Sequence, residues 1–133
     1  MKGKILVVDD EASIRELFTT VFTEADYEVI VAEGGTEALQ ILQVEDIDVI
    51  FLDLKLFGMN GIELCRQIRK TKPISIIYAM TGWGPLFEIE ECREAGFDDY
   101  FEKPLDMDML VGLVAESFAR LNRWKKRYTK LKV

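Results

Sequence analysis

Three short strand-like runs of the sequence each end at a charged residue that could bind a metal ion or a phosphoryl group. The residues that follow these runs are Asp9 and Asp10, Asp53, and Lys103. In an open sheet of parallel strands, ligands bind outside the carboxyl ends of the strands. If the runs are parallel strands of one sheet, three carboxylates and one amine share a crevice.

Carboxylates at such close range repel one another by about 1–4 kcal/mol per pair in a partly exposed site. A divalent cation removes that repulsion, and a set of oxygen ligands without His or Cys favours Mg²⁺ or Mn²⁺. Lys103 adds a positive charge, and Thr81, at the end of another apolar run, adds a hydroxyl group. These groups together suit phosphoryl transfer, and Asp53 is the candidate nucleophile that would form an aspartyl phosphate.

Each of these residues also has a purely structural interpretation. Asp9, Asp10 and Glu11 could cap the following helix, because acidic residues stabilise a helix N-terminus. Asp53 could begin a loop through an Asx-turn, Thr81 could be a turn residue, and Lys103 is one of 17 basic residues. Because four strand ends carry such residues at once, we favour the functional interpretation.

Strand-like and helical patterns alternate along the whole chain. The spacing of apolar residues predicts helices over 12–25, 37–44, 61–72, 86–95 and from 106 onward. It predicts strands over 5–8, 28–32, 48–52, 74–80 and 98–102. This alternation predicts an α/β fold with a five-stranded parallel sheet, doubly wound in the order 2-1-3-4-5. The switch point of that order lies between the first and third strands, where the three aspartates are expected.

Length and composition are those of one globular domain. The chain has 133 residues, of which 49% are hydrophobic and 31% charged. No apolar stretch approaches the ~20 residues of a membrane span, and the run at 5–8 is too short for a signal peptide. Cys65 and Cys92 have no metal-type spacing. We therefore expect a cytoplasmic protein with reduced thiols.

The charge is unevenly distributed. Residues 1–119 carry a net charge of −14, whereas residues 120–133 carry seven basic residues and no acidic one. We expect a domain over 1–119 and a basic helical extension or linker over 120–133. Its apolar residues, Leu121, Trp124, Tyr128 and Leu131, have heptad spacing. The extension could pair with a second copy or lead to an output module, or it could be a solvated helix end; we expect no contact with nucleic acid or membrane.

Five ordered motifs cover nearly the whole of residues 4–119. They are Ile5–Glu11, Val49–Leu54, Met59–Gly61, Met80–Gly82 and Tyr100–Leu105. With these motifs the sequence resembles the receiver domain of two-component response regulators, including the single-domain chemotaxis regulator. The resemblance implies a flavodoxin-like (βα)5 fold and a phosphorylation-activated switch in a phosphorelay. It also implies a signalling protein and not an enzyme, apart from its own Mg²⁺-dependent phosphorylation and dephosphorylation.

The resemblance implies roles for the acidic residues. Asp53 would accept a phosphoryl group from a sensor histidine kinase or a histidine phosphotransfer protein. Asp10, Asp53 and the main-chain carbonyl of Lys55 would bind Mg²⁺ or Mn²⁺, with Asp9 acting partly through water.

Four further residues match positions around the phosphorylation site of the family. Thr81 and Lys103 would bind phosphoryl oxygens after transfer, and Tyr100 would turn inward as Thr81 moves. The bond before Pro104 would be cis, as X–Pro bonds can be at low cost.

Some positions depart from the family pattern. Phe57 stands where proline is usual, and Asn60 stands where aspartate is common. Lys55 and Trp83 lie two residues after Asp53 and Thr81, and we hypothesise that both shield the acyl phosphate from water. The alternative is that both side chains simply point to solvent.

Two other functions remain open at this stage. A pseudo-receiver would use the same fold as a constitutive interaction surface without phosphotransfer. A phosphohydrolase would need a second acid near the nucleophile, and Lys55 occupies that place. The retained acidic residues, Thr81 and Lys103 favour the phosphorylated switch.

Overall fold

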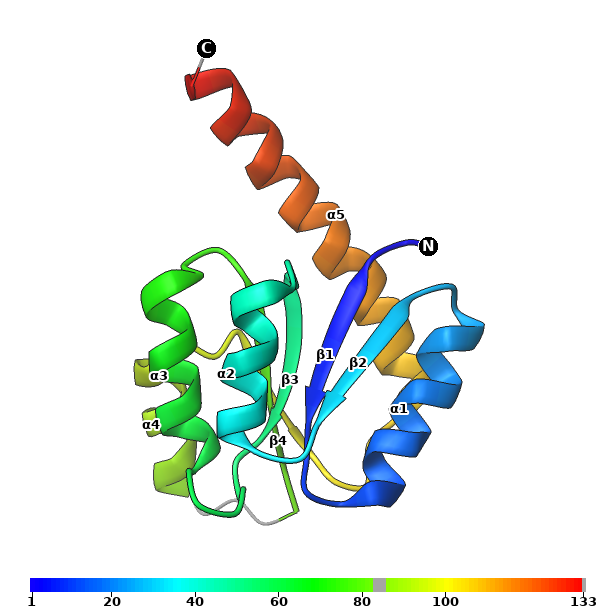
Figure 1. Cartoon of the computed structure of the whole chain (residues 1–133), viewed down its shortest axis with the longest axis vertical. Helices are drawn as coiled ribbons and strands as arrows, with labels where there is room; N and C mark the ends of the chain where they lie inside the picture. Colours follow the sequence, from blue (N-terminus) through cyan, green and yellow to red (C-terminus); the bar gives the residue numbers. More distant parts are fainter. Residues whose placement is uncertain (83–85, 133) are drawn as a thin grey trace.

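In the residues that the structure describes, five strands alternate with five helices (Figure 1). This computed structural model describes residues 1–82 and 86–132, with all side chains there except those of Leu86, Phe87 and residues 128–132. The strands are β1 (Lys4–Val8), β2 (Glu28–Ala32), β3 (Val49–Asp53), β4 (Ile76–Thr81) and β5 (Asp99–Glu102). The helices are α1 (Ala12–Glu24), α2 (Gly35–Val44), α3 (Gly61–Thr71), α4 (Leu86–Ala95) and α5 (Met107–Lys132). None of the described helices is long and apolar enough to cross a membrane.

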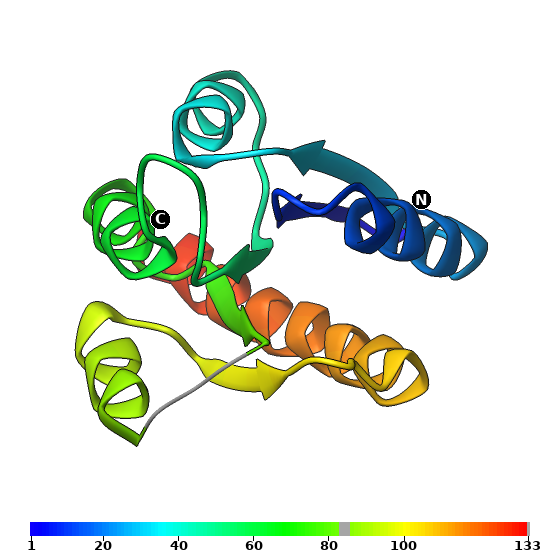
Figure 2. The same cartoon turned by 90° about the horizontal axis from the view of Figure 1, so that it is seen from below.

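The strands form one parallel sheet in the order β2-β1-β3-β4-β5, which confirms the predicted fold. Figure 2 shows α1 and α5 on one face of the sheet and α2, α3 and α4 on the other. Every residue of β3 and β4 is buried, as expected for strands covered on both faces. The carboxyl ends of all five strands therefore lie at one edge, which is the lower edge in Figure 1.

The two faces of the sheet have different cores. Mainly aliphatic side chains fill the side covered by α2, α3 and α4. Aromatic rings fill much of the other side, where the Phe51 ring centroid lies 4.9 Å from that of Phe18 and 5.1 Å from that of Tyr78. Each fully buried ring contributes about 1.5–3 kcal/mol through its burial. The middle strands are thus fixed from both sides.

Helix α5 runs along the sheet and then past its end. Leu110, Val114 and Leu121 are buried against the α1 side of the sheet. Beyond Leu121 the helix leaves the body at the end of the sheet opposite to the strand carboxyl ends (Figure 1). Lys125 still reaches back and binds Asp48. The side chains of Tyr128 and Leu131, part of the predicted heptad pattern, lie outside the described residues.

Strand β4 begins two residues later than its sequence pattern predicts. The Arg69 guanidinium of α3 takes up the main-chain oxygens of Pro73 and Ser75, so these carbonyls do not join the sheet. Pairing starts where the Ile76 amide donates to the carbonyl of Asp48 at 2.8 Å. Side-chain hydrogen bonds from the end of the preceding helix thus occupy the chain just before β4.

Candidate functional site

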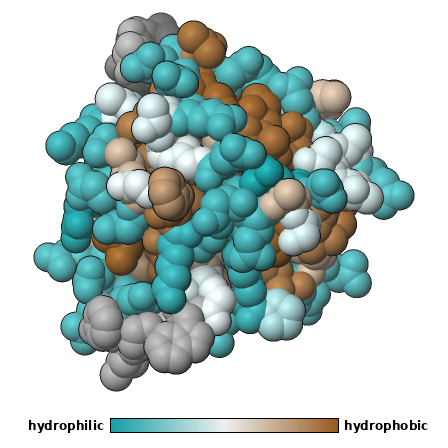
Figure 3. Space-filling view, turned by 60° about the horizontal axis from the view of Figure 1, so that its bottom comes forward, coloured by the Kyte–Doolittle hydropathy of each residue, from teal (hydrophilic) through white to brown (hydrophobic). Residues whose placement is uncertain are grey.

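The carboxyl ends of β1 and β3 bring four acidic side chains together. Carboxylate oxygens of Asp9, Asp10, Glu11 and Asp53 all lie within 4.8 Å of one another. Asp9 is fully buried and Asp53 is 4% exposed, whereas Asp10 and Glu11 are exposed. The predicted meeting of the three aspartates is present, and Glu11 joins them. Figure 3 shows this end of the molecule, where hydrophilic groups lie between hydrophobic patches.

Lys103 binds three members of this acidic cluster from the end of β5. Its Nζ lies 2.9 Å from Asp9 Oδ2, 3.3 Å from Asp53 Oδ2 and 3.4 Å from Glu11 Oε1. Its amide donates to the carbonyl of Thr81 at 2.8 Å, and its bond to Pro104 is cis. One ammonium group thus offsets part of the repulsion within the cluster.

Main-chain amides orient the two buried aspartates. Asp9 Oδ1 accepts from the amide of Glu11 at 2.9 Å, and Asp53 Oδ1 accepts from the amide of Lys55 at 3.2 Å. The second oxygen of each aspartate faces Lys103. The bond from the Lys55 amide is the Asx-turn that was the structural alternative for Asp53. Asp53 thus forms the turn and also belongs to the acidic cluster, so both interpretations hold.

Sequence reasoning missed two residues at this edge. Glu11 was considered only as a helix cap, but it makes no side-chain cap in α1 and instead faces Lys103. Arg15 donates from Nη1 to the carbonyl of Asp9 at 2.8 Å and so holds the turn that carries the acidic residues. Neither contact follows from a local sequence pattern, because Glu11 meets a residue 92 positions away and Arg15 binds a main-chain oxygen.

The loop after β3 packs closely against the chain that carries Asp53. A Cβ atom on Gly61 would lie 2.3 Å from the carbonyl oxygen of Asp53. Asn60, the position where the family commonly has aspartate, caps α3 by accepting from the amide of Glu63 at 2.8 Å. Phe57, in place of the usual proline, is 92% exposed.

Burial and charge raise the pKa of Asp53. Burial has the largest effect and the negative charge of Asp9 adds to it, so the pKa of Asp53 reaches about 6. The amide of Lys55 and the ammonium of Lys103 act in the opposite direction. For Lys103, burial lowers the pKa, but the hydrogen bond to Asp9 and the charge of Asp53 outweigh it and the pKa is raised. The cluster therefore carries more negative charge than Lys103 compensates.

The donor set fits a hard divalent cation. All four clustered side chains offer carboxylate oxygens, and the described part of the cluster includes no sulfur or imidazole ligand. Mg²⁺ prefers such oxygens and commonly keeps several waters when two carboxylates hold it. The predicted contribution of the Lys55 main-chain carbonyl stays a prediction.

The two predicted switch residues lie on neighbouring strands. Thr81 is buried at the end of β4, in register with Glu102 of β5. Tyr100 is half-buried against the core on the α4 side. Burial raises the pKa of Tyr100, the charge of Glu88 adds to this, and the Thr81 side chain lowers it. Tyr100 thus lies within electrostatic reach of both Thr81 and α4.

Of the two residues predicted to shield the phosphate, one can be placed. Lys55 is exposed at the rim and its amide holds Asp53. Trp83 lies outside the described residues.

The comparisons with known proteins agree on one family. The family model of the response regulator receiver domain matches residues 5–115. Sporulation initiation phosphotransferase F of Bacillus subtilis is 38% identical over 108 residues, which are 81% of this chain and 87% of that protein. The DNA-binding response regulator MtrA of Mycobacterium tuberculosis is 37% identical over 123 residues, 92% of this chain but only 52% of that protein. The chain thus spans about half the length of this DNA-binding relative.

Solved structures show the same similarity. A receiver domain protein (CheY-like) from Methanospirillum hungatei has a TM-score of 0.87 at 27% identity, over 91% of this chain and 97% of that one. A BeF3-activated DrrB receiver domain has a TM-score of 0.82 at 28% identity, over 90% of this chain and 99% of that one.

Proposed function

This chain belongs to the response regulator receiver domain family, in which phosphorylation of an aspartate is the general mechanism, and we propose that Asp53 is the aspartate phosphorylated here. One observation carries the proposal: Asp53 is the carboxylate at the end of β3 that faces both Asp9 and Lys103. Its environment keeps one oxygen on the Lys55 amide and the other toward the ammonium group. A nucleophile held by two donors has few orientations to lose before it reacts.

The proposed donor is a phosphohistidine on a sensor kinase or a phosphotransfer protein. A carboxylate oxygen of Asp53 attacks phosphorus, a phosphorus–oxygen bond forms, and the phosphorus–nitrogen bond to the histidine breaks. The departing imidazole takes a proton from solvent. Hydrolysis later returns the carboxylate, because water attacks phosphorus and inorganic phosphate leaves. The reaction needs no oxidant and no other co-reactant.

Asp9, Asp10 and Asp53 are the proposed ligands of Mg²⁺ or Mn²⁺, together with the main-chain carbonyl of Lys55. A bound divalent cation would neutralise the carboxylates and the charge on the phosphoryl group. Glu11 lies within the same set of oxygens and reaches Lys103 at 3.4 Å, so it can balance Lys103 when Asp53 is modified.

Phosphorylation is proposed to change the partners of Lys103 and Thr81. A phosphoryl group on Asp53 offers oxygens to the Lys103 ammonium, and charge-assisted hydrogen bonds of this kind are about twice as strong as neutral ones. Thr81 lies buried at the end of β4, where it pairs with Glu102, the residue before Lys103. Its main-chain carbonyl accepts from the Lys103 amide. Tyr100, in electrostatic contact with Thr81 and α4, would carry the change toward the outer face.

The proposed organisation keeps a receiver over 1–119 and a basic helical extension over 120–133. The Bacillus relative is named as a phosphotransferase and MtrA as a DNA-binding response regulator, so relatives of this domain are named both for phosphotransfer and for DNA binding. For this chain we propose only the receiver step, in the cytoplasm, with a histidine-phosphorylated partner.

A direct experiment tests the assignment of Asp53. The chain is incubated with acetyl phosphate and Mg²⁺, and intact mass and peptide mapping then locate any added phosphoryl group. We expect one phosphoryl group on Asp53, none on Asp53→Asn, and unchanged labelling of Asp46→Asn, an exposed control on the α2–β3 loop. Labelling elsewhere would refute the assignment. No labelling at all would favour the pseudo-receiver, and repeated turnover of phosphate esters would favour the phosphohydrolase.

A further inference from the structure

A groove lies at the end of the molecule opposite to the acidic cluster. Trp124 of α5 and Ile74, just before β4, are 56% and 49% exposed, although both are large and apolar. They line one hollow of about 240 Å³ together with Pro73, Ser75 and Leu121, and we call these five residues the α5 groove. Neighbouring exposed apolar side chains with a hollow between them are typical of contact sites.

Arginine side chains border the α5 groove along the helix. Arg120 lines it directly, and Arg120, Arg123 and Arg127 line an adjoining hollow of about 340 Å³ with Trp124. All three arginines are exposed. The chain from 120 to 133 has seven basic residues and no acidic one. A partner that fits here must therefore combine apolar side chains with negative charge.

A second copy of the same helix does not meet this requirement. In a coiled coil with Leu121 and Trp124 in the seam, the flanking positions are Arg120, Lys125 and Arg127. Pairing of two copies would set these basic residues against one another in either orientation, and like charges disfavour a partner. The charges of the helix thus oppose pairing with a second copy, which was one of the alternatives that its heptad spacing allowed.

Nucleic acid fits less well than an acidic protein segment. Asp98 lines the α5 groove beside the arginines, and Asp48 binds Lys125 from the body. Residues 1–119 have a net charge of −14, so the surface around the extension would repel a continuous phosphate backbone. An amphipathic protein segment, unlike a phosphate backbone, carries its acidic groups on one side only. It can place that side against the arginines of α5.

From this arrangement we infer that the α5 groove is a docking site for an acidic amphipathic helix of another protein. Apolar side chains of that helix fill the space between Ile74 and Trp124, and its carboxylates pair with Arg120 and Arg127. Because the groove and Asp53 lie at opposite ends of the sheet, this partner and the phosphodonor can bind at the same time.

The probe for this inference is a fluorescein-labelled 21-residue helical peptide with Leu at its seam positions and Glu at the flanking ones. A control peptide has Lys in place of every Glu, and a labelled 20-base-pair DNA duplex is a third probe. Binding to the full chain is measured by fluorescence anisotropy at two salt concentrations. We expect saturable binding of the Glu peptide alone, weaker at the higher salt concentration.

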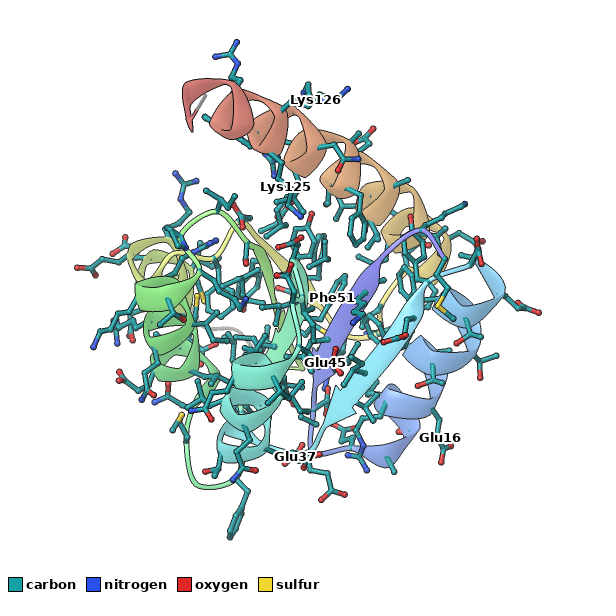
Figure 4. The ribbon with its side chains drawn as sticks, turned by 45° about the horizontal axis from the view of Figure 1, so that its top comes forward. Glu16, Glu37, Glu45, Phe51, Lys125 and Lys126 are labelled. Carbon is teal, nitrogen blue, oxygen red and sulfur yellow. The ribbon has the colours of Figure 1, made fainter. Side chains whose placement is uncertain are left out.

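Three variants locate the site. Trp124→Ala and the pair Arg120→Glu with Arg127→Glu should each weaken binding of the Glu peptide by about tenfold or more, because aromatic and arginine anchors dominate such contacts. Ile74 lines the groove from the body of the domain. Ile74→Ser should therefore weaken binding of the Glu peptide about threefold or more without altering α5. Lys126→Glu, which makes the same type of charge change on the face that points away from the body (Figure 4), should alter binding less than twofold.

Four results of the binding experiments would overturn the inference. They are equal binding of both peptides, equal loss with Lys126→Glu and the arginine pair, no effect of Ile74→Ser, or tighter binding of the DNA duplex than of the Glu peptide. Sedimentation of the chain alone, phosphorylated and not, should show a monomer over the range of concentrations used. A dimer that Trp124→Ala abolishes would also contradict it.

Discussion

Removing the negative charge of Asp53 should stabilise the metal-free protein at neutral pH. Asp53 is held against Asp9, and burial together with that charge raises its pKa from 3.8 to about 6. The folded state therefore binds a proton at Asp53 more tightly than the unfolded chain does. Ionisation costs the folded state free energy that the unfolded chain does not lose, so stability falls as pH rises from about 4 through about 6.

The magnitude follows from this shift. Each pKa unit corresponds to 1.36 kcal/mol, so a shift from 3.8 to about 6 amounts to about 3 kcal/mol as an upper limit. The site opens toward solvent beside the exposed Asp10 and Glu11, and screening reduces the effect. We expect Asp53→Asn to raise the free energy of unfolding by about 1–2 kcal/mol at pH 8 and to leave it nearly unchanged at pH 4.

Urea unfolding in EDTA, at a series of pH values from 4 to 8, measures this difference directly. The matched control is Glu16→Gln, the same carboxylate-to-amide change on α1, where Figure 4 shows Glu16 pointing to solvent. Saturating Mg²⁺ should stabilise the parent protein more than the variant, because a ligand that binds only the folded state adds to its stability. A variant that is less stable at pH 8, or a difference that does not change with pH, would refute the electrostatic reasoning.

Three further substitutions test the surroundings of Asp53. Gly61→Ala should destabilise the protein by about 1–3 kcal/mol in urea, because the new Cβ would lie 2.3 Å from the Asp53 carbonyl oxygen; an unchanged midpoint would show that the loop moves freely. Lys103→Gln should destabilise the metal-free protein by about 1–3 kcal/mol, since Asp9 and Asp53 lose their shared cation, and Mg²⁺ should restore part of the loss; equal stability with EDTA would contradict it. Lys55→Ala should shorten the lifetime of the phosphorylated protein, measured as loss of labelled phosphate, and an unchanged rate would remove the shielding hypothesis.

The alternation of strands and helices could be predicted because local patterns carry it, and the order 2-1-3-4-5 is the common arrangement of five such strands. Buried parallel strands are continuous apolar runs, and the helices between them have a clear apolar face, so the doubly wound sheet follows from alternation and handedness. Strand ends are less predictable. Ile74 belongs to the same apolar run as Ile76, but it lies outside β4 and half exposed. Arg69 binds the main-chain oxygens of Pro73 and Ser75 from only four and six positions earlier, but a side-chain bond to a carbonyl leaves no mark in the pattern of apolar residues.

The residues of the site can likewise be divided into those that the sequence predicts and those that it does not. Asp9 and Asp53 were predictable because each follows an apolar run, and the position of the run fixes the position of the residue. Glu11 was not, because its contact with Lys103 joins residues 92 positions apart and depends on the turn that Arg15 holds. Glu11 does occupy the predicted N-cap position of α1, but its side chain makes no cap hydrogen bond there.

Helix α5 runs between the two ends of the molecule as one unbroken helix. It begins at Met107, shortly after Lys103 and Pro104, and continues as one helix to Lys132. At 1.5 Å per residue its 26 residues span about 39 Å. A tilt of about 5° at its first turn would displace its far end by about 3 Å over that length. A tilt of this kind, started by a change near Lys103, would thus reach the opposite end of the molecule as a displacement as large as a side-chain contact.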